Sequence, residues 1–176
     1  MAEKTIALLG QPNSGKSTLF NGLTGSRQHV GNWPGKTVER KDGVFSHNGI
    51  TYKIVDLPGT YSLSANSDEE VVTRNYISSG EADLVCILAD ASQLNRSLFM
   101  LADYAGIHVP VVLLLNMMDI AEGQGKKINV AGLQKSLGVP VVPMVAADKK
   151  QYQPFFNLLE NLEKRASFLN AAKLEQ

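Results

Sequence analysis

The sequence has too little of several residue types to build the classes of protein that depend on them. Cys86 is its only cysteine, so one chain can form neither a disulfide framework nor a cysteine metal site, as is typical of a reducing compartment. No apolar run approaches the roughly 20 residues that a membrane-spanning helix needs, and residues 1–4 are too polar to begin a secretory signal. We therefore expect this chain to be soluble, with Cys86 in its core.

An excess of charge of one sign is lacking as well. The 17 lysines and arginines balance 17 aspartates and glutamates, and there is no long basic run, so we expect no nucleic-acid partner. The histidines, His29, His47 and His108, are widely spaced and predict no metal cluster. With 176 residues, of which 44% are hydrophobic, the chain fits a single domain over residues 1–176.

What the chain does contain is a complete phosphate-binding loop. Residues 10–17 read Gly-Gln-Pro-Asn-Ser-Gly-Lys-Ser directly after a short apolar run. The glycines let backbone N–H groups point at phosphate oxygens, Lys16 can reach the β- and γ-phosphates, and the Ser17 hydroxyl can ligate Mg²⁺. A chance glycine-rich turn is the less favoured alternative. The residues predicted to bind a nucleoside triphosphate are Gly10, Gln11, Pro12, Asn13, Ser14, Gly15, Lys16, Ser17 and Thr18.

Short apolar runs alternate with amphipathic stretches along the chain. This alternation is typical of an α/β fold, and runs that are apolar on both sides indicate a mostly parallel sheet with helices on both faces. Asn48-Gly49 predicts a hairpin that adds one antiparallel edge strand. We expect six strands, at residues 6–9, 43–46, 50–56, 84–88, 111–115 and 139–142. We expect helices at residues 16–23, 68–78, 93–104, 130–137 and 154–169.

A carboxylate at the end of a predicted strand is the first candidate for holding a metal beside the phosphates. Asp56 lies where its side chain can hold Mg²⁺ through water, and Gly59 offers an N–H to the γ-phosphate without a Cβ in the way. A plain turn is the alternative explanation of this pattern. We assign to the nucleotide site Asp56, Leu57, Pro58 and Gly59.

A second candidate lies in residues 30–38, which lack the periodicity of a stable element. Such a segment can order when phosphate and metal are present. Thr37 would give its hydroxyl to Mg²⁺ and its N–H to the γ-phosphate. Other threonines lie nearby, so spacing alone does not select Thr37.

The sequence Asn116-Met117-Met118-Asp119 follows another predicted strand, at the sheet edge where ligands of open α/β sheets bind. The carboxylate of Asp119 can accept two hydrogen bonds from N1–H and the exocyclic amine of guanine, whereas adenine has no such pair of donors. GTP and GDP are therefore favoured over ATP. The alternative is that Asn116 and Asp119 form an ordinary strand-to-loop cap.

Three segments carry a narrower resemblance, namely residues 10–21, 30–39 and 56–63. They resemble the amino-terminal G domain of the bacterial ferrous-iron transporter family FeoB, and Gly-Asn-Trp-Pro-Gly-Lys-Thr-Val-Glu at residues 31–39 is the most specific match. The resemblance covers nearly the whole chain. It implies a Ras-like P-loop GTPase fold and a single G domain that acts as a slow GTP-hydrolysing switch.

The resemblance also implies a setting for this domain. In the family the G domain lies at the cytoplasmic face of the inner membrane, and a helical domain and a membrane part that carries Fe²⁺ follow it. Neither part is present in this chain, so the iron connection comes from resemblance alone. The resemblance also allows a small cytoplasmic accessory protein as a partner, and assembly of the chain into a homo-oligomer.

The resemblance further implies potassium activation. Thr60 takes the position where Ras-like enzymes have a water-orienting glutamine, and in this family an asparagine, here Asn13, holds K⁺ with carbonyls near Gly31 and Trp33. The cation neutralises developing charge as an arginine finger does, and backbone groups position the water. A loop-stabilising amide is the alternative role for Asn13. The implied catalytic residues are Asn13, Trp33, Thr37 and Gly59.

Two positions depart from the family pattern. Met117 replaces the usual lysine and can pack over the guanine plane, and Ala146 lies where a serine is more usual. The missing hydroxyl removes a hydrogen bond that would organise the base-contacting loop, so we expect a mobile loop and fast guanine release. The loop residues assigned to the base are Val145, Ala146 and Ala147.

Two other functions remain open at this point. One is a guanine-nucleotide-dependent binding module with negligible hydrolysis of its own, which the absence of a glutamine at Thr60 favours and Asn13 opposes. The other is an RNA-associated GTPase of the Era or MnmE type, which shares the Pro-Asn-x-Gly-Lys-Ser loop. The balanced charge weighs against RNA binding.

Overall fold

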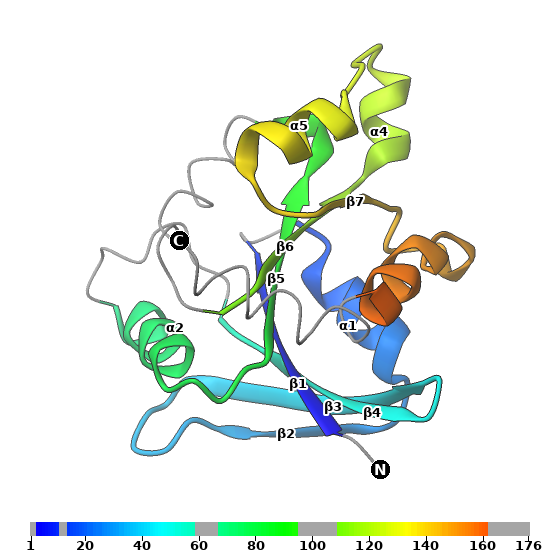
Figure 1. The fold of residues 1–176 in the computed structure, drawn as a ribbon. Helices are drawn as coiled ribbons and strands as arrows, with labels where there is room; N and C mark the ends of the chain where they lie inside the picture. Colours follow the sequence, from blue (N-terminus) through cyan, green and yellow to red (C-terminus); the bar gives the residue numbers. More distant parts are fainter. Residues whose placement is uncertain (1–2, 11–13, 59–66, 95–108, 162–176) are drawn as a thin grey trace, which may run out of the picture.

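A seven-stranded sheet forms the centre of the computed structural model, which describes residues 3–10, 14–58, 67–94 and 109–161 (Figure 1). Its strand order is β2-β3-β4-β1-β5-β6-β7. The strands are β1 (Glu3–Gly10), β2 (Gln28–Asn32), β3 (Glu39–His47), β4 (Ile50–Asp56), β5 (Leu84–Asp90), β6 (Val111–Asn116) and β7 (Val141–Pro143). The helices are α1 (Lys16–Thr24), α2 (Asp68–Ser78), α4 (Met118–Gly123), α5 (Val130–Leu137), the 3₁₀ helices η1 (Ala91–Gln93) and η2 (Lys149–Gln151), and residues 153–161.

The strand pairing confirms the α/β fold and the mostly parallel sheet. β1 pairs in parallel with β4 and β5, β5 with β6, and β6 with β7. β3 runs antiparallel to both of its neighbours, β2 and β4. At the hairpin between β3 and β4, Asn48 and Gly49 have φ angles of 51° and 78°, the positive values that a two-residue type I′ turn requires.

The prediction of six strands is wrong by one, because Gln28–Asn32 forms the edge strand β2. Residues 30–32 therefore have regular structure, contrary to expectation. Gly31 pairs with Arg40 and Asn32 with Glu39, so hydrogen bonds to β3 create this strand. Its burial does not alternate along the chain, and alternation is the signal by which a sequence reveals a strand.

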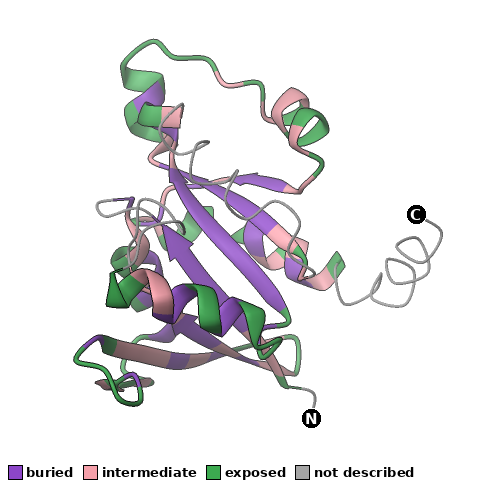
Figure 2. Cartoon of the chain, turned by 90° about the vertical axis from the view of Figure 1, so that its left-hand side faces the viewer, coloured by how far each residue is buried: buried purple, intermediate pink, exposed green. Residues whose placement is uncertain are grey.

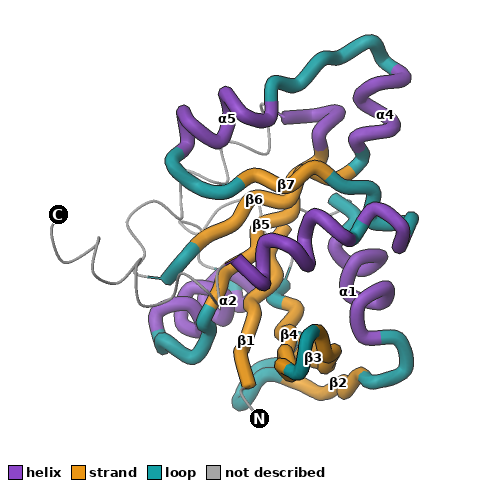
Figure 3. The backbone as a smooth tube through the Cα atoms, turned by 45° about the vertical axis from the view of Figure 1, so that its right-hand side comes forward, coloured by secondary structure: helices purple, strands orange, loops and turns teal. Residues whose placement is uncertain are grey.

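Side chains pack on both faces of the sheet in two clusters, and Figure 2 shows that the central strands are mostly buried. On one face Leu19 and Phe20 of α1 meet Phe155 and Leu159 of residues 153–161, and Figure 3 shows these two helices on the same side. On the other face α2 and α5 contribute a second cluster. The last helix thus packs on the sheet as predicted.

Local signals explain why two helices have the predicted bounds. The Ser67 hydroxyl accepts a hydrogen bond from the backbone N–H of Glu70 and caps α2, and the Asn129 side chain does the same for Gly132 in α5. Gly138 ends α5 with φ 72°, a conformation that glycine adopts without strain. Most of the helix expected at residues 93–104, and the end of that at 154–169, lie outside the described residues. α4 was not predicted.

The hairpin tip is fastened to the last helix by polar and aromatic contacts. His47 Nε2 lies 2.8 Å from Glu160 Oε1, and Asn48 Nδ2 donates to the same oxygen at 2.7 Å. The His47 ring stacks on Phe156 with 4.7 Å between centroids. These contacts hold the helix of residues 153–161 against the β3–β4 end of the sheet.

Replacing Phe155 by alanine should lower the free energy of unfolding by about 3–5 kcal/mol, because this fully buried ring would leave a cavity. Phe156→Ala is the matched control, since Phe156 is only partly buried. It should lower the free energy of unfolding by a clearly smaller amount. Urea unfolding followed by circular dichroism measures both. Equal losses would contradict this packing of the helix.

Cys86 should resist thiol reagents in the folded protein. Complete burial in β5 raises the pKa of its thiol to about 12, so almost no thiolate, the reactive form, exists at neutral pH. A chromogenic disulfide reagent should react slowly with the native chain and rapidly in urea. Fast native reaction would show that β5 is accessible.

Candidate nucleotide-binding site

Three strands end at one edge of the sheet, and each ends in a residue assigned to the nucleotide. Gly10 ends β1, Asp56 ends β4 and Asn116 ends β6. These strands run parallel through β1 and β5, so their carboxyl ends meet at the edge where open α/β sheets bind ligands. The fold therefore brings the predicted phosphate, metal and base residues to the same edge.

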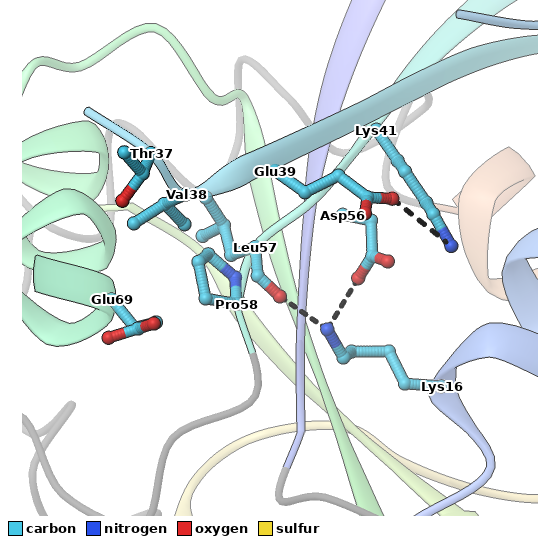
Figure 4. A pocket seen from close by; sticks show the side chains of 9 residues that line it. All are labelled: Lys16, Thr37, Val38, Glu39, Lys41, Asp56, Leu57, Pro58 and Glu69. Atoms are coloured by element: carbon cyan, nitrogen blue, oxygen red, sulfur yellow. Dashed lines mark hydrogen bonds and ion pairs between the residues drawn. The ribbon is translucent and has the colours of Figure 1, made fainter. Parts of the chain in front are cut away.

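Lys16 and Asp56 form the polar centre of the phosphate side (Figure 4). The ammonium of Lys16 lies 2.5 Å from Asp56 Oδ1 and also donates to the backbone carbonyl of Leu57. The two side chains are only 12% and 11% exposed, so solvent screens their charges little. Lys16, which we assign to the phosphates, and Asp56, which we assign to Mg²⁺, are thus in contact. Two residues that bind one metal-bound triphosphate have to lie close together.

A pocket of about 310 Å³ opens beside this ion pair. It brings Thr37 to the same space as Lys16 and Asp56 (Figure 4), which is the grouping that the sequence predicts. Sequence reasoning missed three charged residues of the lining, of which Lys41 stands opposite Asp56 in the β3–β4 register. The lining residues are Lys16, Thr37, Val38, Glu39, Lys41, Asp56, Leu57, Pro58 and Glu69.

Close backbone approach explains the two glycines of the phosphate loop. Gly15 has φ 93° and precedes α1, and a Cβ on it would collide with the side-chain amide of Asn116. A Cβ on Gly10 would lie 2.6 Å from Ser14 Oγ. Ser14 is 4% exposed, and its hydroxyl has no hydrogen-bond partner within the part of the chain that the structure describes.

Asn116 joins the phosphate loop to the base loop, which we define as residues 145–148. Its Nδ2 donates to the carbonyl of Ser14 at 2.9 Å, and its Oδ1 accepts from the N–H of Ala146 at 2.7 Å. Asn116 is 3% exposed. Its amide therefore organises both loops, while the exposed carboxylate of Asp119 accepts from the N–H of Ile120 at 2.9 Å.

The base loop contains a contact that sequence reasoning missed. Tyr152 donates its hydroxyl hydrogen to the carbonyl of Ala146 at 2.6 Å. Burial, and then the charge of Asp148, raise the pKa of Tyr152, so the hydroxyl keeps the proton that it donates. Within the loop, Val145 is partly buried, Ala146 buried and Ala147 exposed. A lone tyrosine after the loop is no recognisable sequence signal.

Met117 lies next to the phosphate loop. It adopts a left-handed conformation, with φ 61°, at the start of α4, and its Cε lies 3.8 Å from the place of a Cβ on Gly15. Non-glycine residues with positive φ are uncommon and mark functional or strained positions. Its contact with a guanine base stays a prediction.

Trp33 is anchored where β2 ends. Its backbone N–H donates to the carbonyl of Val38 at 2.9 Å, and its carbonyl accepts from the backbone N–H of Lys36 at 3.0 Å. Its ring meets Tyr76 edge-on at 5.5 Å, and the Arg40 guanidinium lies 4.6 Å over it. The Trp33 carbonyl assigned to K⁺ thus closes a turn, and Gly31 lies within β2.

The remaining predicted residues divide into two groups. Ser17 and Thr18 lie exposed in the first turn of α1, and Leu57 is buried. Outside the described residues lie Gln11, Pro12, Asn13 and Gly59, so the potassium and water-positioning roles stay predictions. Among the residues described, no three His, Cys, Asp or Glu side chains form a group that could hold a metal ion, and no helix has the length and apolarity to cross a membrane.

Comparison with known proteins identifies the family of this chain. The family model described as ferrous iron transport protein B matches residues 4–161. The Fe(2+) transporter FeoB of Escherichia coli (strain K12) is 50% identical over 150 residues, which are 83% of this chain and 19% of that protein. The chain therefore spans about a fifth of the length of such curated relatives.

Two solved structures extend the similarity to the fold. The G domain of the T. maritima FeoB iron transporter matches with a TM-score of 0.83 and 41% identity, covering 93% of this chain and 99% of that one. The cytosolic domain of the same transporter in its GMPPNP form matches with a TM-score of 0.85 and 42% identity, covering 93% and 64%. The chain belongs to the ferrous iron transport protein B family, and its fold is that of the family's G domain.

Proposed function

We propose that this chain binds GTP and GDP with Mg²⁺, hydrolyses GTP slowly, and acts as the regulatory switch of a ferrous-iron membrane transporter. The contact between Lys16 and Asp56, beside a pocket that Thr37 also lines, is the observation that carries the proposal. The GMPPNP form of the T. maritima relative and the transport function in the name of the E. coli relative support it.

The donors of the pocket, together with Ser17 next to Lys16 in α1, fit a triphosphate with its metal. Oxygens of Ser17, Thr37 and Asp56 are the hard ligands that Mg²⁺ prefers, and the ammonium of Lys16 suits the phosphates. The Ser14 hydroxyl, which is buried and has no hydrogen-bond partner among the described residues, is a further polar group that could meet a phosphate oxygen. When bound, Mg²⁺ neutralises charge on the phosphates.

Selection of guanine is proposed for the other side of the site. Asp119 would accept from N1–H and the exocyclic amine, because its exposed carboxylate is free of ion pairs in the described structure. Met117 would cover the base with its flexible side chain. Val145, Ala146 and Ala147 would contact the base, in a loop that Asn116 holds through the N–H of Ala146.

Hydrolysis is proposed to depend on K⁺ held by Asn13 and by the carbonyls of Gly31 and Trp33, with Thr37 and Gly59 positioning the water. The hydrogen bond from Lys36 to the Trp33 carbonyl would compete with that cation. The carbonyl has a second lone pair, so K⁺ would either share the oxygen with this bond or weaken the turn of residues 33–36. A binding module with negligible hydrolysis of its own is the alternative if guanine nucleotide binds but is not turned over in either salt.

The larger assembly follows from the family. The chain would work at the cytoplasmic face of the inner membrane as part of a full transporter with helical and transmembrane parts, and its further partners would be an accessory protein or other copies of itself. Fe²⁺ would be the cargo of the whole transporter.

GTP turnover should be faster in KCl than in NaCl at equal ionic strength, by at least about 10-fold, because a cation at Asn13 acts as an arginine finger does. Asn13→Ala should remove the difference, and Asn157→Ala, on the exposed face of the last helix, should keep it. Phosphate release measures both. Equal turnover in the two salts would refute potassium activation, and nucleotide binding without turnover in either salt would favour the binding module.

Asp56→Asn should lower Mg²⁺-dependent GTP turnover by about 10–100-fold, because the carboxylate that holds the hydrated metal is lost. Asp83→Asn is the control, since Asp83 accepts a hydrogen bond from Thr5 at the opposite end of the sheet. A magnesium titration of phosphate release distinguishes the two. An unchanged magnesium requirement in Asp56→Asn would exclude the assigned role.

A further inference from the structure

The base loop is tied to the rest of the molecule through both polar backbone atoms of one residue. The N–H of Ala146 donates to Asn116, and its carbonyl accepts from the Tyr152 hydroxyl. Ala146 is 3% exposed and has only a methyl side chain. The loop's other described hydrogen bonds are local, from Asp148 to Val145 and from Lys150 and Gln151 to Asp148. Its position therefore depends on two side chains that lie outside it.

Tyr152 is held rigidly enough to act as such a support. It is 3% exposed, and its carbonyl accepts from Phe155 and Phe156 at the start of the last helix. Its hydroxyl lies against Gly22 of α1, where a Cβ would collide with the hydroxyl and come within 3.1 Å of Cζ. A glycine inside a helix costs stability, and here it makes the room that the phenol occupies.

A continuous set of hydrogen bonds therefore crosses the candidate site. The Ser14 carbonyl accepts from Asn116, Asn116 accepts from Ala146, and the Ala146 carbonyl accepts from Tyr152. All three bonds are buried, where water cannot replace a lost partner and an unmade bond is costly. Tyr152 ends this set and is the one member that no nucleotide-binding motif includes.

We propose that Tyr152 is a positioning residue that slows release of guanine nucleotide by holding the base loop closed through its hydroxyl. The proposal rests on the proposed binding of GDP and GTP. A base leaves the site only when the loop beside it moves, and that motion must break or strain the bond to Tyr152. Ala146 has no hydroxyl of its own, and the hydroxyl that hydrogen-bonds to the loop comes from Tyr152 instead.

Tyr152→Phe tests this, because it removes the hydroxyl and keeps the ring. Stopped-flow displacement of a fluorescent GDP analogue by excess GDP should show release faster by about 2- to 12-fold, the range that one hydrogen bond spans, with an unchanged association rate. Tyr52→Phe is the matched control, since Tyr52 lies in the same core cluster and is also 3% exposed. Its release rate should equal that of the wild type.

Gly22→Ala is a second variant, which keeps the hydroxyl but displaces it. It should speed release when Tyr152 is present and have a smaller effect in Tyr152→Phe, where the collision with the hydroxyl is gone and only the tight contact with the ring remains. Hydrogen exchange of the nucleotide-free chain should rise at residues 145–148 in Tyr152→Phe and stay constant in β1 and α2. A purely structural role for Tyr152 would instead raise exchange throughout the core cluster that contains it.

Unchanged release in Tyr152→Phe would overturn the proposal, and so would equal acceleration in Tyr52→Phe. If the wild-type chain fails to bind the GDP analogue, the proposed function fails together with this inference. If the wild type binds the analogue and Tyr152→Phe releases it at the wild-type rate, the inference alone fails. Hydrogen exchange at residues 145–148 is measured without nucleotide, so it reports whether Tyr152 holds the loop even if the chain does not bind the analogue.

Discussion

The side-chain amide of Asn116 is the contact on which the candidate site depends. It is buried, and its two polar atoms are used on the backbones of two different loops, at Ser14 and Ala146. Two charge-free hydrogen bonds in a low-dielectric interior are each worth more than at a surface, and each is costly to leave unmade. The same amide lies so close to Gly15 that no side chain fits there. The phosphate loop, β6 and the base loop are therefore one structural unit.

The pocket beside this unit has a mixed charge. Lys16 and Lys41 line it together with Glu39, Asp56 and Glu69, so a triphosphate entering alone would meet carboxylates as well as ammonium groups. Under the proposed function a divalent cation resolves this conflict, because it is attracted by the carboxylates and by the phosphates together. The ion pair of Lys16 with Asp56 keeps both charges satisfied in the protein itself.

Local patterns explain what the sequence could predict. The bounds of α2 and α5 follow from caps and apolar spacing, and the Asn48-Gly49 turn from the φ values that it needs. The meeting of Lys16 with Asp56 follows from the rule that parallel strands end at one edge. β2 escaped prediction because its pairing with β3 creates it. The bond from Tyr152 to Ala146 escaped because it depends on a gap at Gly22, far away in the sequence.

Trp33 gives the protein an optical property that follows from its position. It is the chain's single tryptophan, and its ring lies between the Arg40 guanidinium and the edge of Tyr76. Indole emission responds to nearby charge and to water, and all tryptophan emission of the chain originates at one point, where β2 leads into the turn of residues 33–36. When tryptophan is excited selectively over the five tyrosines, any rearrangement of that turn that separates the indole from the guanidinium becomes visible without a label.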